Sequence, residues 1–298
     1  MSISVVINSL NEAEYLHRAL SSVKNFADEI VVVDMNSDDD TAKIAKKAGA
    51  KVFKHKRINY VEPARNYAIS KATGDWIFVL DPDEKLPKTL TTKLNEIMKD
   101  PEADYYRVPR KNVVFGKWME HSRWWPDYNI RFFRKDFVDW SEEIHSVPVT
   151  TGKGADLPVE EEMAIIHFNY TSVDQYLNRL MRYTTVQSDE LIKAGYKFEW
   201  TDLITKPVGE FLSRYFQGQG YKDGLHGLVV ATLQGLSEFI VYLRVWEADK
   251  FKPRDLEITS VLSATKEASS DYNYWKADAL LRESGGLKNR LKRKFKIS

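Results

Sequence analysis

Three acidic residues follow directly after an apolar run in Trp76-Ile77-Phe78-Val79-Leu80-Asp81-Pro82-Asp83-Glu84. An apolar run of this length, bounded by Gly74 and Pro82, predicts a strand buried on both faces of a parallel sheet. Ligands bind at the carboxyl edge of such sheets, and two acids separated by one residue can offer oxygens to Mg²⁺ or Mn²⁺. The stretch therefore indicates either a site for a metal and a phosphorylated ligand or, more simply, a solvated acidic turn.

Upstream of this stretch the chain alternates strands with helices. The predicted elements are a strand at Ser4–Ile7, a helix from about Tyr15 to Val23, a strand at Glu29–Asp34, a helix at about Thr41–Ala48, a strand at Lys51–Lys54 and a helix at about Pro63–Ala72. Successive β-α units predict an α/β fold with a right-handed parallel sheet and helices on both faces. Two of these strands end at Asn8-Ser9 and at Asp34, on the same edge as Asp81, and this edge is the predicted site.

Aromatic residues are dense in the middle of the chain, from Phe115 to Trp140. They serve either as core packing or as a platform for a sugar ring, whose C–H face suits an aromatic face. A helix from Pro87 to about Asp100 and a half-buried strand at Asp104–Arg110 precede them. The last predicted strand is Ala164–Phe168.

The C-terminal part of the chain is predicted to be helical. A long helix begins after Ser172, which is a suitable N-cap, and ends before Gly195. Further helices are predicted over Leu225–Trp246, Arg254–Lys266 and Asp271–Arg282. The expected division is therefore between residues 1–170 and residues 171–298.

The composition is that of an ordinary globular protein. The 298 residues are 43% hydrophobic and 29% charged, with a formal net charge of +1, which argues against bulk electrostatic binding of nucleic acid. The chain has no cysteine, so disulfides and zinc-thiolate sites are excluded and a reducing cytosolic setting is permitted. The N-terminal residues lack the basic and apolar regions of a signal peptide, and none is expected.

The Leu225–Trp246 stretch is strongly apolar but includes the charged residues Glu238 and Arg244. A membrane-spanning helix needs about 20 residues with few or no charges, which disfavours a span here. Three interpretations stay open: a buried helix, a contact between copies in a homo-oligomer, or a helix lying in the plane of a membrane.

The last twelve residues hold six basic residues together with Leu287, Leu291 and Phe295 spaced four apart. This pattern is typical of a basic amphipathic anchor, for which each cation near an anionic surface contributes about 1 kcal/mol. The alternative is a frayed, solvated tail. Peripheral contact with an anionic membrane is thus expected from the apolar stripe rather than from the charge alone.

Five motifs in the first ninety residues together resemble glycosyltransferase family 2, whose members are inverting enzymes of the GT-A fold. They are Ser4-Val5-Val6-Ile7-Asn8-Ser9-Leu10-Asn11-Glu12, Val31-Val32-Val33-Asp34, Ser37-Asp38-Asp39, Ala64-Arg65-Asn66 and Asp81-Pro82-Asp83-Glu84. Their order and spacing are far more specific than any one of them. The resemblance implies a GT-A catalytic domain over residues 1–170. It also implies a helical region over 171–298 that serves membrane association and the acceptor side.

Four later segments are similar to the lipopolysaccharide core β-glucosyltransferase branch of that family. They are Arg123-Trp124-Trp125-Pro126-Asp127, Arg131-Phe132-Phe133-Arg134, Ile144-His145 and Gly220-Tyr221-Lys222-Asp223-Gly224. The resemblance therefore spans most of the chain, although it is weaker beyond the nucleotide-binding half.

Matched position by position, the resemblance implies a nucleotide-sugar site. Ser9, Leu10 and Glu12 would form the lip around the nucleoside. Asp34 would contact the base, most simply uracil, and Arg65 would support the phosphates.

The same resemblance divides the work of the acidic stretch. Asp81 would contact the ribose or the shell of the metal, and Asp83 would be the direct ligand of Mg²⁺ or Mn²⁺. Departure of a nucleoside diphosphate builds negative charge that such a cation can neutralise.

An inverting transfer is a single displacement, so one base must take the proton of the attacking hydroxyl. Members of the family generally use a carboxylate from the acceptor-side half, which implies Glu143 or Glu142. Asp127 and His145 are further candidates. Relatives often carry His followed directly by Glu, whereas Ser146 follows His145 here.

The sequence thus predicts a metal-dependent, inverting transferase that moves a hexose from a nucleotide-sugar donor to a glycan or glycolipid acceptor. The expected place of work is the cytoplasmic face of the cell membrane, with Trp124, Trp125, Asp127 and His145 on the acceptor side. One alternative is a nucleotidyltransferase, which would usually show a Gly-rich phosphate loop that is absent near the N-terminus. The other is a non-catalytic, membrane-associated scaffold on a transferase fold, which has no reason to retain a costly cluster of acids.

Overall fold

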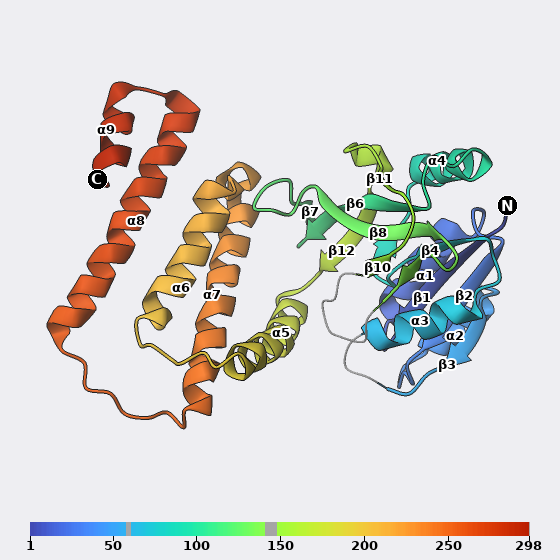
Figure 1. The fold of residues 1–298 in the computed structure, drawn as a ribbon, viewed down its shortest axis with the longest axis horizontal. Helices are drawn as coiled ribbons and strands as arrows, with labels where there is room; N and C mark the ends of the chain where they lie inside the picture. Colours follow the sequence, from blue (N-terminus) through green and yellow to red (C-terminus); the bar gives the residue numbers. More distant parts are fainter. Residues whose placement is uncertain (58–60, 141–147, 298) are drawn as a thin grey trace. The chain divides into compact units, whose positions relative to one another are not determined.

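The computed structural model describes residues 1–57, 61–140 and 148–297, and the chain divides into two compact units (Figure 1). The first unit comprises Met1–Val113 and Pro126–Asn169, and the second comprises Val114–Trp125 and Tyr170–Ser298. The second unit therefore includes a short segment that the predicted division after residue 170 assigned to the first.

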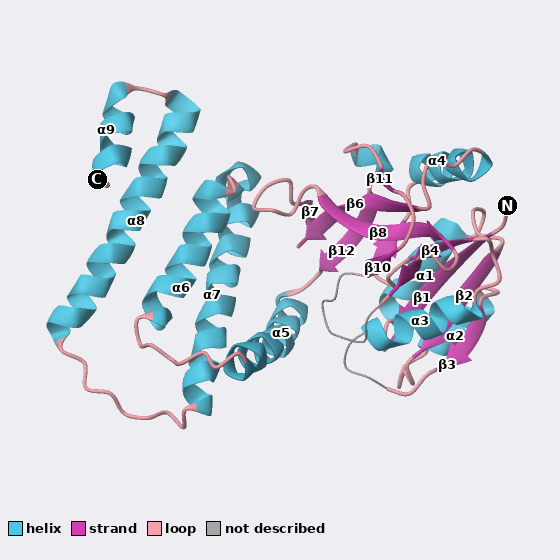
Figure 2. Cartoon of the chain, viewed as in Figure 1, coloured by secondary structure: helices cyan, strands magenta, loops and turns pink. Residues whose placement is uncertain are grey.

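The first unit is built around a mixed sheet (Figure 2). Its strands are β1 (Ile3–Ser9), β2 (Glu29–Asp34), β3 (Lys51–Lys54), β4 (Trp76–Val79), β5 (Glu84–Lys85), β6 (Tyr105–Val114), β8 (Asp127–Arg134), β11 (Gly154–Asp156) and β12 (Ile165–Tyr170). The main order is β3-β2-β1-β4-β8-β6-β12-β5. The pairs β3-β2, β2-β1 and β1-β4 are parallel, which confirms the predicted parallel sheet over these four strands.

Beyond β4 the sheet changes direction. Strand β8 pairs with β4 antiparallel and with β6 antiparallel, and Phe78 lies opposite Phe132. The predicted strand at 104–110 corresponds to the longer β6, whereas β8 lies in the aromatic stretch for which no strand was predicted. A separate two-stranded sheet joins β9 (Val138–Asp139) to β10 (Val149–Thr150).

Helices cover both faces of the parallel part. They are α1 (Ala13–Val23), α2 (Thr41–Lys47), α3 (Glu62–Lys71) and α4 (Lys88–Lys99), followed by the 3₁₀ turn η1 (Glu161–Met163). Alternate residues of β4 enter two different cores: Phe78 packs with the apolar residues of α1 and α4, and Ile77 packs with those of α3. The predicted burial of this strand on both faces is therefore confirmed.

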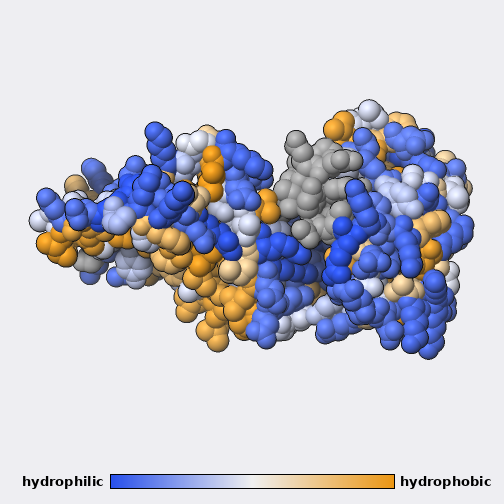
Figure 3. Space-filling view, turned by 90° about the horizontal axis from the view of Figure 1, so that it is seen from below, coloured by the Kyte–Doolittle hydropathy of each residue, from blue (hydrophilic) through white to orange (hydrophobic). Residues whose placement is uncertain are grey.

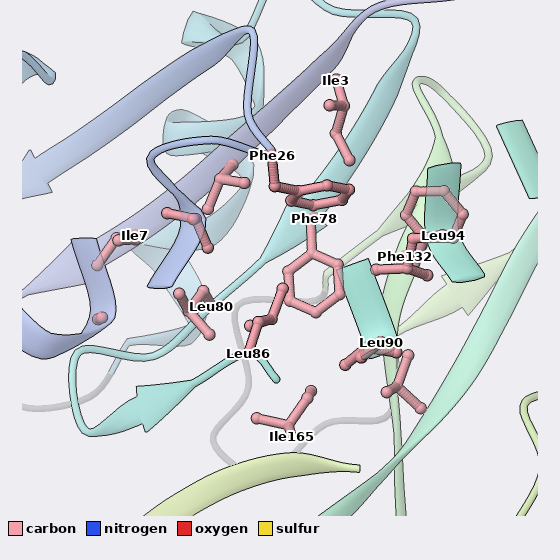
Figure 4. Close-up of a cluster of buried hydrophobic side chains, with 14 of the residues drawn as sticks. Ile3, Ile7, Phe26, Phe78, Leu80, Leu86, Leu90, Leu94, Phe132 and Ile165 are labelled. Carbon is pink, nitrogen blue, oxygen red and sulfur yellow. The ribbon is translucent and has the colours of Figure 1, made fainter. Parts of the chain in front are cut away.

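The larger of these cores has aromatic rings at its centre (Figure 4). Trp76 stacks on Phe132 with ring centroids 4.4 Å apart, and Phe26 meets Phe78 edge-on at 6.5 Å. Leu90 and Leu94 of α4 lie over the same rings. Phe132 and Phe133 are fully buried, so for these residues the core interpretation of the aromatic stretch is correct.

The second unit is helical. Its elements are β7 (Lys117–Trp118), α5 (Val173–Lys193), α6 (Asp202–Leu212), the π-helical turn η2 (Ser213–Gln217), the 3₁₀ turn η3 (Gly220–Asp223), α7 (Gly224–Ala248), α8 (Ile258–Ser284) and α9 (Leu287–Phe295). Ser172 caps α5 as predicted, because its Oγ accepts the Gln175 N–H at 3.1 Å. Helix α8 runs unbroken through two predicted helices, since the four residues from Glu267 to Ser270 include no glycine or proline to end it.

Segment Val114–Trp125 is held to the helices by a buried acid. The Asp223 carboxylate accepts the backbone N–H groups of His121 at 3.0 Å and of Glu120 at 3.3 Å, and His121 Nδ1 lies 3.1 Å from it. Gly227 permits this arrangement, because a Cβ there would lie 1.7 Å from the Gly220 carbonyl oxygen. The segment before Pro126 and the segment at Gly220–Gly224, both noted in the sequence, thus meet in one unit.

Within the described chain, one helical stretch, Gly220–Ala248, is long and apolar enough to cross a membrane by length and composition alone. Core helices of soluble proteins share this property, so it is weak evidence. Several of its apolar residues are buried inside the second unit, among them Val230, Ala231 and Val241, while Leu225 and Leu228 are exposed.

A buried carboxylate closes the amino edge of the parallel sheet. Glu29 accepts hydrogen bonds from Ser4 Oγ at 2.6 Å, Lys51 Nζ at 2.5 Å and the Thr73 N–H at 2.8 Å. Burial alone would raise its pKa, but these donors outweigh burial and lower the pKa to about 2. Because this value lies below the ordinary one, the ionised group stabilises the fold above about pH 4.5 and loses that effect as the pH falls toward 2.

We expect Glu29→Gln to lower the free energy of unfolding by about 1–2 kcal/mol at neutral pH, a figure reduced for solvent screening of the exposed Lys51. Urea denaturation at about pH 7 and about pH 3 measures this effect. The gap between wild type and variant should shrink at the lower pH, because the Glu29 carboxylate of the unfolded chain then takes up a proton that the native carboxylate, with its pKa of about 2, does not. A gap that stays constant over that range would contradict the role given to the charge.

Candidate active site

The predicted nucleoside-binding residues lie together at the carboxyl edge of the parallel strands. Ser9 and Asp34 are the last residues of β1 and β2, lie opposite each other in the parallel register, and are both buried. Asp34 Oδ1 accepts the Ser37 N–H at 3.1 Å, which begins the turn toward α2. The prediction that these strand ends share one edge is therefore confirmed.

Hydrogen bonds tie the loop after β1 to the loop after β2. Asn11 donates its N–H to Ser37 Oγ at 2.9 Å and accepts the Asp38 N–H at 2.8 Å. The N–H of Glu12, the N-cap of α1, is donated to Thr41 Oγ1 at 2.8 Å. Leu10 and Glu12 are half-buried on this edge, so the two loops form one preorganised rim.

Asp81 is held by two arginines. Its Oδ1 accepts from Arg65 Nη2 at 3.2 Å, and its Oδ2 accepts from Arg131 Nη2 at 2.5 Å. Burial would raise the pKa of Asp81, but the charges of Arg131 and Arg65 hold it far below its usual range. Both oxygens of this carboxylate are thus engaged by the protein, which makes Asp81 a counter-ion of the site rather than a readily available metal ligand.

Glu84, to which the sequence assigned no particular role, lies beneath this pair and has no exposed surface. Its Oε2 accepts the Asp81 N–H at 2.8 Å, and its Oε1 lies 3.0 Å from Arg131 Nη2 and 3.5 Å from Arg110 Nη1. Burial raises the pKa of Glu84, and the neighbouring Asp81 charge raises it further, although Arg131 opposes both. Glu84 therefore fixes the Asp81–Glu84 turn from inside.

Asp83 faces a histidine that no sequence motif indicated. Its Oδ2 lies 3.5 Å from Nε2 of His167 on β12, and both residues are buried. Asp83 was the predicted metal ligand. The sequence feature that could have pointed to His167 is its position in the strand Ile165–Tyr170, where it lies on the same buried face as Ile165.

The hydrogen bonds around His167 fix the orientation of its ring. Asp127 can only accept, so the Asn112 amide directs its nitrogen to Asp127 at 2.9 Å and its oxygen to His167 Nδ1 at 2.6 Å. His167 Nδ1 therefore donates, and Nε2 is the nitrogen that faces Asp83. Histidines that bind metals commonly hold their other nitrogen in this way.

The donor set at Asp83 and His167 fits a divalent cation. Within the described ranges no three His, Asp or Glu side chains cluster closely enough to hold a metal by themselves. Mg²⁺ sites, however, commonly use only one or two protein ligands together with waters and substrate phosphates. Asp83 Oδ2 and His167 Nε2 face each other across 3.5 Å, both are atom types that ligate divalent cations, and the imidazole favours a transition metal such as Mn²⁺ over Mg²⁺.

Asp127 is poorly suited to be the catalytic base. It accepts from Arg110 Nε at 2.7 Å as well as from Asn112 and Asn129. Burial would raise its pKa, but Arg110 and the two amides lower it below the ordinary value. A carboxylate stabilised in this way is a weak base. Asp127 instead helps to orient His167, because it binds the amide of Asn112, which in turn accepts from His167 Nδ1.

The remaining predicted residues fall either in the second unit or outside the described part of the chain. Glu142, Glu143 and His145 lie outside the described residues. Trp124 and Trp125 belong to the second unit, where Trp124 packs against a small core of Val114, Met119 and Val230. Trp125 meets Trp118 edge-on with ring centroids 5.3 Å apart.

Comparison with known proteins identifies the class to which this fold and site belong. The family model described as "Glycosyl transferase family 2" matches residues 4–151. An uncharacterised glycosyltransferase of Rickettsia typhi is 30% identical over 247 residues, which cover 80% of this chain and 84% of that protein. The chain therefore belongs to glycosyltransferase family 2, and the predicted α/β fold of GT-A type with a helical C-terminal region is confirmed.

A more specific relative is the lipopolysaccharide core biosynthesis glycosyltransferase LpsC of Rhizobium meliloti. It is 27% identical over 266 residues, which cover 85% of this chain and 95% of LpsC. This homologue agrees with the resemblance of the sequence to the lipopolysaccharide core branch of the family.

Solved structures give weaker likenesses. Residues 1–349 of TarS from S. aureus are 16% identical with a TM-score of 0.42, over 87% of this chain and 94% of that one. Glucosyl-3-phosphoglycerate synthase of Mycobacterium tuberculosis, crystallised with Mn²⁺, UDP and glucosyl-3-phosphoglycerate, is 24% identical with a TM-score of 0.32, over 39% and 44% of the two chains.

We expect Arg131→Met to lower the free energy of unfolding by about 3–5 kcal/mol, because Asp81 and Glu84 would remain buried without their shared cation. The matched control is Arg107→Met, since Arg107 pairs with Asp156 at 2.5 Å on the surface. Its loss should stay below about 1 kcal/mol. Urea unfolding followed by tryptophan fluorescence compares the two variants, and equal losses would show that the buried cluster is not the stabilising element.

Proposed function

We propose that the protein transfers a hexose from a nucleoside-diphosphate sugar, UDP-linked in the simplest case, to a glycan or glycolipid acceptor, with inversion and with a divalent cation. The observation that carries this proposal is that Asp83 Oδ2 and His167 Nε2 face each other, 3.5 Å apart. They lie at the sheet edge where strands β1 and β2 end, at Ser9 and Asp34. Membership of glycosyltransferase family 2 supports the class of reaction. The similarity to LpsC supports a lipopolysaccharide-core type of acceptor.

The rim of the site is suited to the nucleoside. Ser9 and Asp34 lie at the base of this edge, and Leu10 and Glu12 line the loop above them. Asp34 is the proposed partner of the uracil ring, and the bonds between the two loops hold that partner in place before the donor arrives.

The acidic turn is suited to the diphosphate. A cation bound at Asp83 and His167 would neutralise the charge that builds on the departing diphosphate. Arg65 lies beside Asp81 and supports the phosphates, while Arg131 and Glu84 keep the turn rigid from below. Asn112 orients the ring of His167 through the hydrogen bond at Nδ1, so that Nε2 faces Asp83.

The proton of the attacking hydroxyl requires a separate base. Asp127 is stabilised as a carboxylate by Arg110, so the proposal keeps Glu143 or Glu142 in this role. The reaction would then be one displacement, with the acceptor oxygen entering opposite the departing diphosphate.

Release of nucleoside diphosphate from a panel of nucleotide sugars, with Mg²⁺, Mn²⁺ or a chelator, tests the reaction. Asp83→Asn and His167→Ala should each lower turnover at least about 100-fold and weaken Mn²⁺ binding measured by electron paramagnetic resonance. The matched control is Asp156→Asn, which removes a surface acid of the same unit and should retain both. Wild-type turnover in Asp83→Asn would exclude the metal role, and pyrophosphate release from a nucleoside triphosphate and a sugar phosphate would indicate a nucleotidyltransferase.

The base is identified by comparing Glu143→Gln with Glu142→Gln. The variant that removes the base should bind donor normally, because the base contacts the acceptor, yet turn over at least about 100-fold more slowly. The other variant serves as its control. Donor affinity and single-turnover transfer measure the two properties separately, and full activity in both variants would refute the assignment.

A further inference from the structure

The C-terminal helix α9 packs on α8 through its polar side. Arg293 Nη1 donates to Asp278 Oδ1 at 2.8 Å, and Lys296 Nζ donates to Asp271 Oδ1 at 2.9 Å. Asn289 donates to the Gly285 carbonyl oxygen at 2.8 Å and begins the same side of the helix. The tail is thus an ordered helical hairpin rather than the frayed, solvated segment that was one of its two interpretations.

The apolar side of α9 faces away from α8. Leu287, Leu291 and Phe295 follow one another at intervals of four, so they form one stripe, and their exposures are 72%, 47% and 59%. A helix of a soluble domain ordinarily buries its apolar stripe against the core. Here the polar side is used for packing and the apolar side is presented outward.

Cations border the stripe on both sides. By helical spacing Arg290 and Lys294 lie along one side of it, and Lys288 and Lys292 lie along the other. The first turn of α9 holds no acid. An apolar stripe flanked by cations matches the boundary between acyl chains and anionic headgroups.

We propose that α9 is an in-plane docking helix that binds the surface of an anionic bilayer through Leu287, Leu291 and Phe295. The ion pairs with Asp278 and Asp271 orient it, so that the stripe is available without any rearrangement of the helix. The flanking cations select the anionic lipid as the occupant, because a second copy of this positively charged surface would be repelled. This inference rests on the second unit alone and is independent of the proposed reaction.

Other apolar side chains are exposed in the second unit, and in Figure 3 the orange side chains of this unit gather along one side, opposite the blue ones. On α7 they include Leu225, exposed to 72%, and Leu228. Helix α7 carries no Lys or Arg before Arg244, and Lys222, three residues before Leu225, is paired with Glu283, which is why α9 is assigned the contact. Leu225 and Leu228 also provide a matched comparison.

Flotation of the full-length protein with phosphatidylcholine vesicles, with and without phosphatidylglycerol, tests the assignment. The double variant Leu291→Ser with Phe295→Ser should bind the anionic vesicles at least about tenfold more weakly. The double variant Leu225→Ser with Leu228→Ser should bind as the wild type does. Thermal unfolding and donor hydrolysis in solution should be unchanged in both variants, because the substituted side chains are exposed and lie outside the donor site.

The charge component is tested by Lys288→Gln, Arg290→Gln and Lys294→Gln. Each removed cation should weaken binding to anionic vesicles about fivefold and reduce its salt dependence. Equal binding to vesicles with and without phosphatidylglycerol would overturn the selectivity. Binding that survives the Leu291 and Phe295 substitutions, or that is lost only with Leu225 and Leu228, would overturn the assignment to α9. Association through the cations alone, as with a nucleic acid, would do the same.

Discussion

The structure of the site depends on one buried cation, Arg131, placed between the two carboxylates of Asp81 and Glu84. Arg131 and Glu84 are buried and Asp81 is half-buried, and charges withdrawn from water are tolerated only when their geometry is nearly complete. The antiparallel register provides that geometry: Phe78 lies opposite Phe132, so Arg131 comes next along β8, beside the end of β4. The acidic turn is therefore held by the antiparallel strand β8, and Asp83 lies in a turn whose backbone is firmly fixed.

A second layer of polar contacts continues from this centre. Arg110 lies near Glu84 and also binds Asp127, which accepts from Asn112, which in turn accepts from His167. Three strands, β6, β8 and β12, thus contribute to the orientation of one imidazole. Low local dielectric strengthens each bond in such a chain and makes each missing partner costly, so the relay acts as a unit. The antiparallel half of the sheet thus provides the residues that form this chain of hydrogen bonds.

The parallel half of the fold could be predicted from the sequence because its strands are continuous apolar runs that end in polar residues. Strand β8 could not, because Asp127–Arg134 mixes charged, polar and aromatic residues without alternation, and its buried arginine is explained only by acids fifty residues earlier. His167 was missed for a similar reason: its partner Asp83 is distant in sequence, and the motif containing Asp83 gives no indication of it. The order of the motifs identified the family and the sheet edge at which the site lies. The contacts between side chains on different strands became visible only in the structure.

The placement of Val114–Trp125 in the helical unit has a consequence for how such enzymes diversify. After β6 the chain contributes this segment, which includes β7, to the helical unit, returns as β8, and only later enters the helices for good. A recombination event that exchanged residues after 170 would separate Asp223 from the backbone of His121 and would divide the small core around Val230. An exchange of the helical unit between relatives is therefore expected to preserve the fold only when Val114–Trp125 and the chain after residue 170 are exchanged together.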